Sequence, residues 1–287
     1  MKRSCGSPLT VSMLLSQFVH RRVPVAVLTV VAILFCPIAG SGVLGASPRP
    51  GFGNGSLQGS YSVLLNKWTS DTGRKPEALV GVFGFDGAGN VTITSFTDNN
   101  GGTITTGTGT GTYSVKANGT GTMPVTLSNG DSGTFSIVLD AKGKGFQMML
   151  TTCSQGCGTN VLSGTAVATG GSSFSNASLK GGYEFLTVKW TWSQSTDSQN
   201  ALGIFTFDGA GKVKAALTQD RAGTVTTIKA TGSYSVNSDG SGSMALTGKQ
   251  GSITFAFAID AAGKGSQLIS TISGGNDPVQ SGTTAKQ

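Results

Sequence analysis

The sequence predicts an all-β protein built from two tandem antiparallel up-and-down β-barrels of about eight strands each. The first observation is a duplication, since the segment GVFGFDGAG at 81–89 returns as GIFTFDGAG at 203–211. A repeat longer than about 100 residues is too long for a solenoid and is typical of a duplicated domain. The second observation is a series of short β-rich runs between Gly, Asn and Asp turns, which indicates consecutive hairpins.

The strands of the first copy are expected at regular intervals. Strand-like runs lie at 60–68, 79–85, 90–97, 103–106 continuing to 110–116, 121–127, 133–139, 146–152 and 160–167. Meandering hairpins of this kind close naturally into a barrel, because closure leaves no edge strand unpaired. Two β-sandwiches are the alternative architecture. The run at 79–85 is apolar on both faces, which predicts that its outer face is covered, for example by the other barrel.

The first 46 residues have the pattern of an export signal. Basic residues precede an apolar run at 23–38, and small residues follow it. The run is about 16 residues long, which is short for a membrane span. An uncleaved anchor or a lipoprotein attached at Cys36 is the alternative. We expect cleavage between about Gly40 and Pro48, a secreted, periplasmic or cell-envelope location, and membrane contact only through an uncleaved signal.

Counting the signal peptide, the chain divides into five segments. The expected boundaries are a signal peptide at 1–46, a flexible leader at 47–56, barrel repeat 1 at 57–168, a linker at 169–178 and barrel repeat 2 at 179–287.

Four of the 20 basic residues lie in the signal, so the chain beyond it has 16 basic and 13 acidic residues, a net charge of +3. This balance, without a basic cluster, gives no support for nucleic-acid binding.

The sequence excludes histidine chemistry beyond the signal. His20 is the only histidine and lies inside that segment. Catalysis by Ser-His-Asp or Cys-His groups and histidine metal sites are therefore excluded. We expect no catalytic residue, no metal and no cofactor. A His-independent enzyme would need a buried pair of carboxylates or a lysine of lowered pKa.

The duplicated aspartate–glycine segments are interpreted as structural turns. They comprise Asp86, Gly87 and Gly89 in repeat 1, and Asp208, Gly209 and Gly211 in repeat 2. Each aspartate ends a strand before glycine, where its carboxylate can accept hydrogen bonds from nearby backbone N–H groups. The final glycine is expected at positive φ, as in a type I turn with a G1 bulge.

Two further groups are candidates for a role. Cys153 and Cys157 flank three residues at a predicted hairpin tip, and in an exported protein a local disulfide is expected there. Aromatic and basic residues at the end of the first strand of each repeat could contact a ligand at a barrel mouth: Lys67, Trp68, Lys189, Trp190 and Trp192. A hydrophobic plug or packing between the barrels is the other reading of these tryptophans.

The motifs of both repeats resemble those of calycin-type barrels. These motifs are Leu-x-Gly-x-Tyr, then Gly-x-Phe-x-Phe-Asp-Gly-x-Gly-x-Val, then Gly-x-Tyr-Ser-Val before Asn/Asp-Gly-x-Gly. They are most similar to allene-oxide-cyclase-like and lipocalin-like repeats of secreted microbial proteins. The resemblance implies the barrel fold. Lipocalins have Gly-x-Trp on the first strand, where this chain has Tyr61 and Tyr183.

Together these features predict an exported, non-enzymatic tandem barrel that binds a small apolar molecule or a glycan. The alternatives are a structural or interaction protein of the cell envelope and a His-independent enzyme of isomerase or cyclase type. An internal cavity lined by apolar side chains would favour the first function, and solid barrels with an exposed flat patch the second. The oligomeric state is left open by the sequence.

Overall fold

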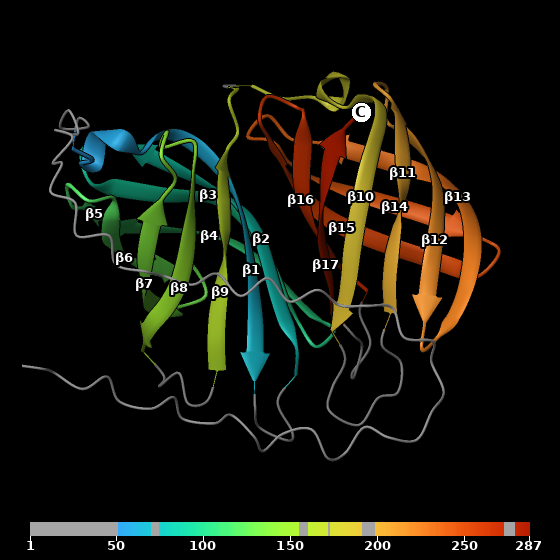
Figure 1. The fold of residues 1–287 in the computed structure, drawn as a ribbon, viewed down its shortest axis with the longest axis horizontal. Coiled ribbons are helices and arrows are strands. Elements are labelled where there is room, and N and C mark those ends of the chain that lie inside the picture. Colours follow the sequence, from blue (N-terminus) through green and yellow to red (C-terminus); the bar gives the residue numbers. More distant parts are fainter. Residues whose placement is uncertain (1–50, 70–74, 155–159, 172, 191–198, 273–278) are drawn as a thin grey trace, which may run out of the picture. The chain divides into compact units, whose positions relative to one another are not determined.

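The computed structural model describes residues 51–69, 75–154, 160–171, 173–190, 199–272 and 279–287. All of these residues belong to one compact unit, which comprises residues 48–287. The expected all-β architecture is confirmed, because the strands form two antiparallel barrels in tandem (Figure 1). None of the helices in the described ranges is long and apolar enough to cross a membrane.

Barrel 1 contains nine strand segments. They are β1 (Gln58–Thr69), β2 (Glu77–Asp86), β3 (Asn90–Asn100), β4 (Thr103–Thr112), β5 (Ser114–Val115), β6 (Thr120–Leu127), β7 (Ser132–Leu139), β8 (Gly145–Cys153) and β9 (Asn160–Ala168). Apart from β4 and β5, neighbours in sequence pair with each other, and β1 pairs with β9 to close the circle. Both β4 and β5 pair with β6, so they act as one interrupted strand of an eight-stranded barrel.

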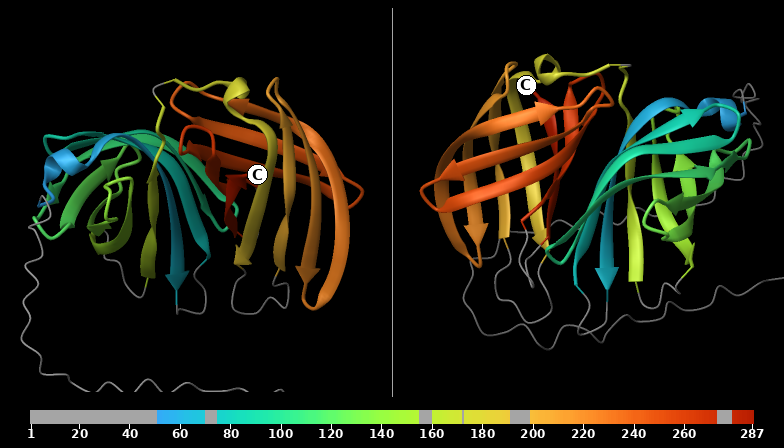
Figure 2. Two further views of the ribbon diagram at one scale, coloured as in Figure 1. Left: turned by 45° about the horizontal axis from the view of Figure 1, so that its top comes forward. Right: turned by 180° about the vertical axis from the view of Figure 1, so that it is seen from behind.

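Barrel 2 is a closed ring of eight strands. They are β10 (Lys180–Trp190), β11 (Gln199–Asp208), β12 (Lys212–Arg221), β13 (Thr224–Val236), β14 (Ser241–Gly248), β15 (Gly251–Asp260), β16 (Gly265–Ser270) and β17 (Val279–Lys286). Figures 1 and 2 show this sheet curling round until β17, in dark red, lies beside β10, in yellow. The alternation of inward apolar and outward polar residues predicts such a barrel, since successive strand residues point to opposite faces.

Equivalent tyrosines of the two repeats close one end of each barrel. The Tyr61 hydroxyl donates to the Gly143 carbonyl at 2.8 Å, and the Tyr183 hydroxyl donates to the Gly263 carbonyl at 2.6 Å. A second pair, Tyr113 and Tyr234, donates to backbone carbonyls of the segment that enters its barrel. These partners satisfy hydroxyl groups that would be costly to bury unpaired.

The described residues just before β1 and β10 make the same contacts with their barrels. Each segment ends in a 3-10 turn, η1 (Asn54–Ser56) or η2 (Asn176–Ser178). Asn54 accepts from the Val115 N–H at 2.8 Å, and Asn176 accepts from the Val236 N–H at 2.9 Å. Phe52 packs on the barrel 1 core and Phe174 is buried in the barrel 2 core. The structural repeat therefore begins about five residues before the boundary that the strand pattern indicates.

The outer face of β2 is covered, as its two-sided apolar pattern predicts. Ala78, Val80 and Val82 point away from the barrel 1 interior, yet all are buried. They belong to an apolar cluster that β15, β16 and β17 of barrel 2 complete. The backbone N–H groups of Ala261 and Ala262 add hydrogen bonds across to residues 168 and 169.

Candidate ligand-binding site

Barrel 2 encloses a cavity of about 840 Å³. Its mouth lies where β11 begins and β12 ends, and the exposed residues Gln250 and Gly251 stand beside it. The opposite end of the barrel is the one that Tyr183 and Tyr234 close. In the described part of the chain, barrel 2 is therefore a cup whose opening faces away from these tyrosines.

The inner wall of this cavity is apolar. Phe185 and Phe205 stack with ring centroids 3.9 Å apart and planes 6° from parallel. Leu217, Ile228 and Ile253 face the interior but are only half-buried, because the cavity lies in front of them. Such aliphatic surface is normally covered in a core, so its exposure to an internal space favours occupation by an apolar group.

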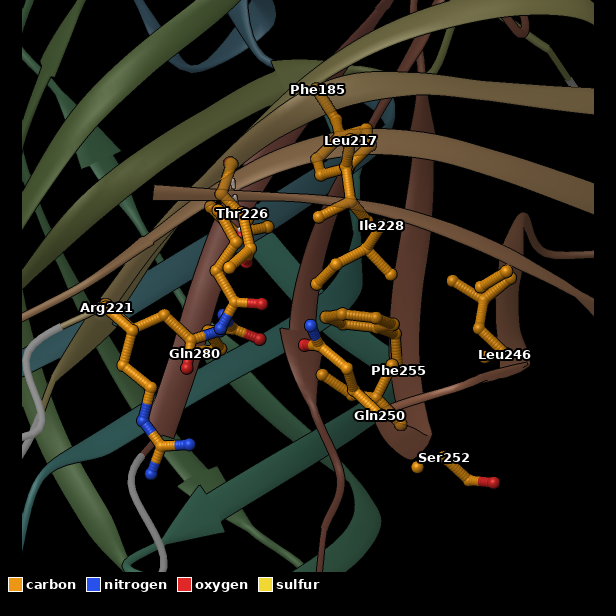
Figure 3. Close-up of a pocket in the computed structure, with 18 of the residues that line it drawn as sticks. Phe185, Leu217, Arg221, Thr226, Ile228, Leu246, Gln250, Ser252, Phe255 and Gln280 are labelled. Atoms are coloured by element: carbon orange, nitrogen blue, oxygen red, sulfur yellow. Dashed lines mark hydrogen bonds between the residues drawn. The ribbon is translucent and has the colours of Figure 1, made fainter. Parts of the chain in front are cut away.

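The polar residues of the cavity are mostly uncharged. Figure 3 shows Phe185, Leu217 and Ile228 gathered at one end, with Gln250 and Arg221 toward the other. Gln199, Gln219, Gln280 and Thr226 also line the cavity. Arg221 is the only charged side chain among the described residues of this lining. An amide both donates and accepts hydrogen bonds, so this rim can pair with a neutral polar group.

Barrel 1 has a smaller cavity, of about 450 Å³, and it contains charges. Lys67 and Glu77 form an ion pair at its edge. Asp98 and Asp131 also line it. Oδ1 of Asp98 is buried and has no hydrogen-bond partner among the described residues. The two cups therefore differ in chemistry as well as in size.

The environment of Asp98 strongly favours its neutral form. Burial raises the pKa of this carboxyl to about 8, and repulsion from Glu77 acts in the same direction, while Lys67 opposes the rise. Desolvation disfavours a charged carboxylate, and so does a like charge nearby. Asp98 is therefore mostly protonated at neutral pH.

Strand register explains why the cavities differ. Lys67 pairs with Glu77 and Lys189 with Gln199, so a glutamate in barrel 1 corresponds to a glutamine in barrel 2. In the same way Leu79 pairs with Asp98, whereas Ala201 pairs with Gln219. The two carboxyl positions Glu77 and Asp98 of barrel 1 thus have neutral amides as their counterparts.

The apolar counterparts account for the difference in volume. Leu65 and Leu79 fill the barrel 1 cup, and the matching residues of barrel 2 are Thr187 and Ala201. Similarly, Ile93 pairs with Phe83 in barrel 1, where barrel 2 has Ala215 opposite Phe205. Smaller side chains at the same inward positions leave the larger space.

Of the residues expected from sequence to contact a ligand, only the two lysines can be placed with their side chains. Lys67 lines the barrel 1 cavity, whereas half-buried Lys189 is not part of the barrel 2 lining. Trp68 is the last residue but one of β1 and Trp190 is the last of β10, but their side chains, like all of Trp192, lie outside what the structure describes. Their contact with a ligand stays a prediction.

The aspartate–glycine segments form turns. Oδ1 of Asp86 accepts from the N–H groups of Ala88, Gly89 and Asn90 at 2.7, 3.0 and 2.9 Å. Asp208 accepts from Ala210 and Lys212 at 2.7 and 2.9 Å. These hydrogen bonds hold the pKa of each carboxyl below its usual value, to about 2 for Asp86, with the Asn90 side chain contributing most there. The φ angles of the glycines are positive: Gly87 77°, Gly89 117°, Gly209 81° and Gly211 105°.

The remaining expectations concern cysteine and metal. Cys153 ends β8, but Cys157 lies outside the described residues, so the disulfide stays a prediction. Within the described ranges, no group of three or more His, Cys, Asp or Glu side chains could hold a metal ion.

Comparison with known proteins does not identify the ligand or the function of the cavity. No family model matches the chain, and no curated protein matches it. A solved structure from the DUF3598 family of Nostoc punctiforme is 11% identical, covering 81% of this chain and 97% of its own, with a TM-score of 0.25. Transferrin binding protein B of Neisseria meningitidis is 7% identical, covering 81% and 77%, with a TM-score of 0.30. Neither similarity is close enough to identify a ligand or a reaction.

Sequence reasoning missed the glutamines and small residues that shape the barrel 2 cup. A signal was present, because the duplication allows the inward positions of the two repeats to be compared. Thr187 stands where repeat 1 has Leu65, and Ala201 where it has Leu79. Loss of bulk at two inward positions of one copy would have indicated the hollow barrel.

Proposed function

We propose that barrel 2 binds a small, largely apolar molecule that carries a neutral hydrogen-bonding end. The observation that carries this proposal is the 840 Å³ cavity with half-buried aliphatic walls. Ligand sites for small molecules commonly enclose about 300–1,000 Å³ and combine apolar walls with a few polar groups. A glycan is less suited to it, because a sugar presents hydroxyl groups on most of its surface and those that face the aliphatic and aromatic part of the lining would stay unpaired.

The polar end of the ligand is assigned to the glutamines. Gln280 is buried and lines the cavity, as does the half-buried Gln219. A site that presents buried amides rejects a ligand that leaves them unpaired. The only charged side chain in the described lining of barrel 2 is Arg221, at the end of β12 beside the mouth. In barrel 1, by contrast, the same ligand would have to desolvate Lys67, Glu77 and Asp98.

The test uses a cavity-filling variant that borrows residues from barrel 1. Thr187→Leu with Ala201→Leu introduces the side chains that barrel 1 already accommodates. We expect this variant to lose binding of N-phenyl-1-naphthylamine, a neutral apolar fluorophore, while remaining folded by circular dichroism. Ala216→Leu is the matched control, because Ala216 is exposed on the outside of β12 and its variant should bind like the wild type. Equal binding by all three proteins would overturn the proposal.

A second variant tests the polar end. Gln280→Leu should weaken binding of 1-naphthol and leave binding of naphthalene nearly unchanged, because only the first probe has a hydroxyl group to pair. An equal effect on both probes would mean that Gln280 contributes volume and not recognition.

Acid–base chemistry in barrel 1 is a second candidate function, and Asp98 is the observation that favours it. A carboxylic acid protonated at neutral pH beside the carboxylate of Glu77 is the pair that a His-independent enzyme requires. The protein would be incubated with a metabolite extract and new products followed by mass spectrometry. A product formed by the wild type and by Thr187→Leu/Ala201→Leu, but not by Asp98→Asn, would support this activity in barrel 1.

A further inference from the structure

The contact between the two barrels joins two different surfaces. On barrel 1 it uses the outside of β1 and β2, where Leu64, Val80 and Val82 are 6%, 2% and 0% exposed. On barrel 2 it uses the outside of β15, β16 and β17, where Ala258, Ile269 and Val279 are all 0% exposed. Because the barrels are copies of one unit, each surface has a counterpart on the other barrel.

The counterpart of the first surface is the β10–β11 face of barrel 2, formed by Leu186, Leu202 and Ile204. Register sets Leu186 opposite Leu202, as Leu64 is set opposite Val80. The β10–β11 face is nevertheless uncovered, since its three residues are 51%, 59% and 38% exposed. They line a groove on the outside of the barrel.

The counterpart of the second surface is the β7–β9 face of barrel 1, formed by Val138, Met149 and Val161. Val138 occupies the place of Ala258, Met149 that of Ile269 and Val161 that of Val279. These residues are 52%, 48% and 50% exposed. Gln147 on this face is also exposed, whereas the matching Gln267 is 1% exposed in the contact.

These two faces hold most of the large hydrophobic side chains that are exposed in the described residues. Of the eight large hydrophobic side chains that are exposed in the described part of the chain, six belong to them. Clustered apolar residues on a protein surface mark an interaction site, whereas single ones need no explanation. The six cluster as the two unused halves of a contact that the chain already makes once.

We propose that the β10–β11 face of one molecule binds the β7–β9 face of a second copy of the same chain. This contact between two molecules would have the same arrangement as the contact between the two barrels of a single molecule. It is heterologous, so each molecule keeps one free face at each end, and association continues into chains unless the rotation closes a ring.

The intermolecular contact is weaker than the internal one for identifiable reasons. Glu184 on the β10–β11 face replaces Ser62, which is fully buried in barrel 1. Asp220 likewise replaces Asn99, whose amide donates to the Ser270 carbonyl at 2.7 Å across the internal contact. Desolvating a carboxylate opposes docking, so association should depend on concentration.

Sedimentation velocity of residues 48–287, the compact unit with both cores, tests the proposal over a concentration series. We expect the average mass of the wild type to rise with concentration. Leu202→Lys and Met149→Lys should each weaken association at least about tenfold, while Glu184→Ser should strengthen it. Thr231→Lys is the matched control, because Thr231 is exposed on β13 and neither it nor the residues it pairs with lie on either face, so its change should have no effect.

The decisive experiment mixes the two disabling variants, Leu202→Lys and Met149→Lys. Leu202→Lys retains an intact β7–β9 face and Met149→Lys an intact β10–β11 face, so each should be monomeric alone and an equimolar mixture should form dimers that do not grow. A wild type that stays monomeric throughout, or a mixture that stays monomeric when the wild type associates, would overturn the head-to-tail contact. Association of the wild type that survives both substitutions would assign it to another surface.

Discussion

The two barrels are nearly identical at their closed ends and different at their open ends. Tyr61 and Tyr183 make the same hydrogen bond, and Asn54 and Asn176 make the same capping contact. At the mouths, by contrast, Asp98 corresponds to Gln219. The duplication has thus kept the residues that close each barrel and changed those that determine what it could hold.

The difference in filling gives the largest expected effect. Leu79→Ala removes a buried side chain from the barrel 1 cup and should destabilise that barrel by roughly 2–5 kcal/mol, the usual cost of emptying such a site. Ala201→Leu, the reverse change in barrel 2, should cost much less because the cavity has room for the added atoms. Hydrogen exchange read by mass spectrometry would report each barrel separately. Equal losses would mean that the barrel 2 cup is already filled.

The difference in charge predicts that above pH 6 only barrel 1 depends on pH. The Asp98 carboxyl has a pKa of about 8 in the folded protein, compared with 3.8 ordinarily, so the folded state holds a proton that the unfolded chain has released. Stability contributed by that proton is complete at low pH and falls as pH rises from about 4 to 8. The loss for barrel 1 over this range should be on the order of 5 kcal/mol, at about 1.4 kcal/mol for each pKa unit.

Asp98→Asn should remove this dependence, with Asp220→Asn as the exposed-aspartate control. Asp260 in barrel 2 also has a raised pKa, of about 6, because of burial, so the decisive window is pH 6 to 8. Hydrogen exchange across that window should show weakening of barrel 1 alone in the wild type. A barrel 1 whose protection is constant over the window would show that Asp98 is ionised throughout.

The fold could be predicted from the sequence because its determinants are local and occur twice. Turn glycines, strand alternation and the repeated tyrosines are each visible without knowing what they contact. The site was harder, because whether a barrel is hollow depends on the summed volumes of inward residues from eight strands. Asp98 shows the second difficulty: the repeat spacing aligns it with Asp220, but an irregularity in register near Phe83 makes Gln219 its spatial counterpart.

The shared turns should respond alike in both barrels. Gly89 has φ of 117°, and a Cβ there would lie 2.9 Å from Nδ2 of Asn54. Gly89→Val should therefore destabilise barrel 1 by roughly 1–3 kcal/mol, the cost of a strained backbone position. Gly211→Val should do the same to barrel 2, whereas Ala88→Val should be mild because Ala88 is not at positive φ. Chemical denaturation that shows equal tolerance at Gly89 and Ala88 would contradict this turn geometry.

The smallest expected effect concerns a feature that only one barrel has. Cys153 lines the cavity of barrel 1, and the corresponding segment of barrel 2, residues 273–277, contains no cysteine. A Cys153–Cys157 disulfide closes a very short loop, so it should stabilise barrel 1 by no more than about 2 kcal/mol and leave barrel 2 unaffected. Intact mass should rise by two hydrogen atoms on reduction, and the variant with both cysteines changed to serine should still fold. Loss of the barrel 1 fold in that variant would instead make the bridge essential for closing the open end, and an unchanged mass would show that no bridge forms.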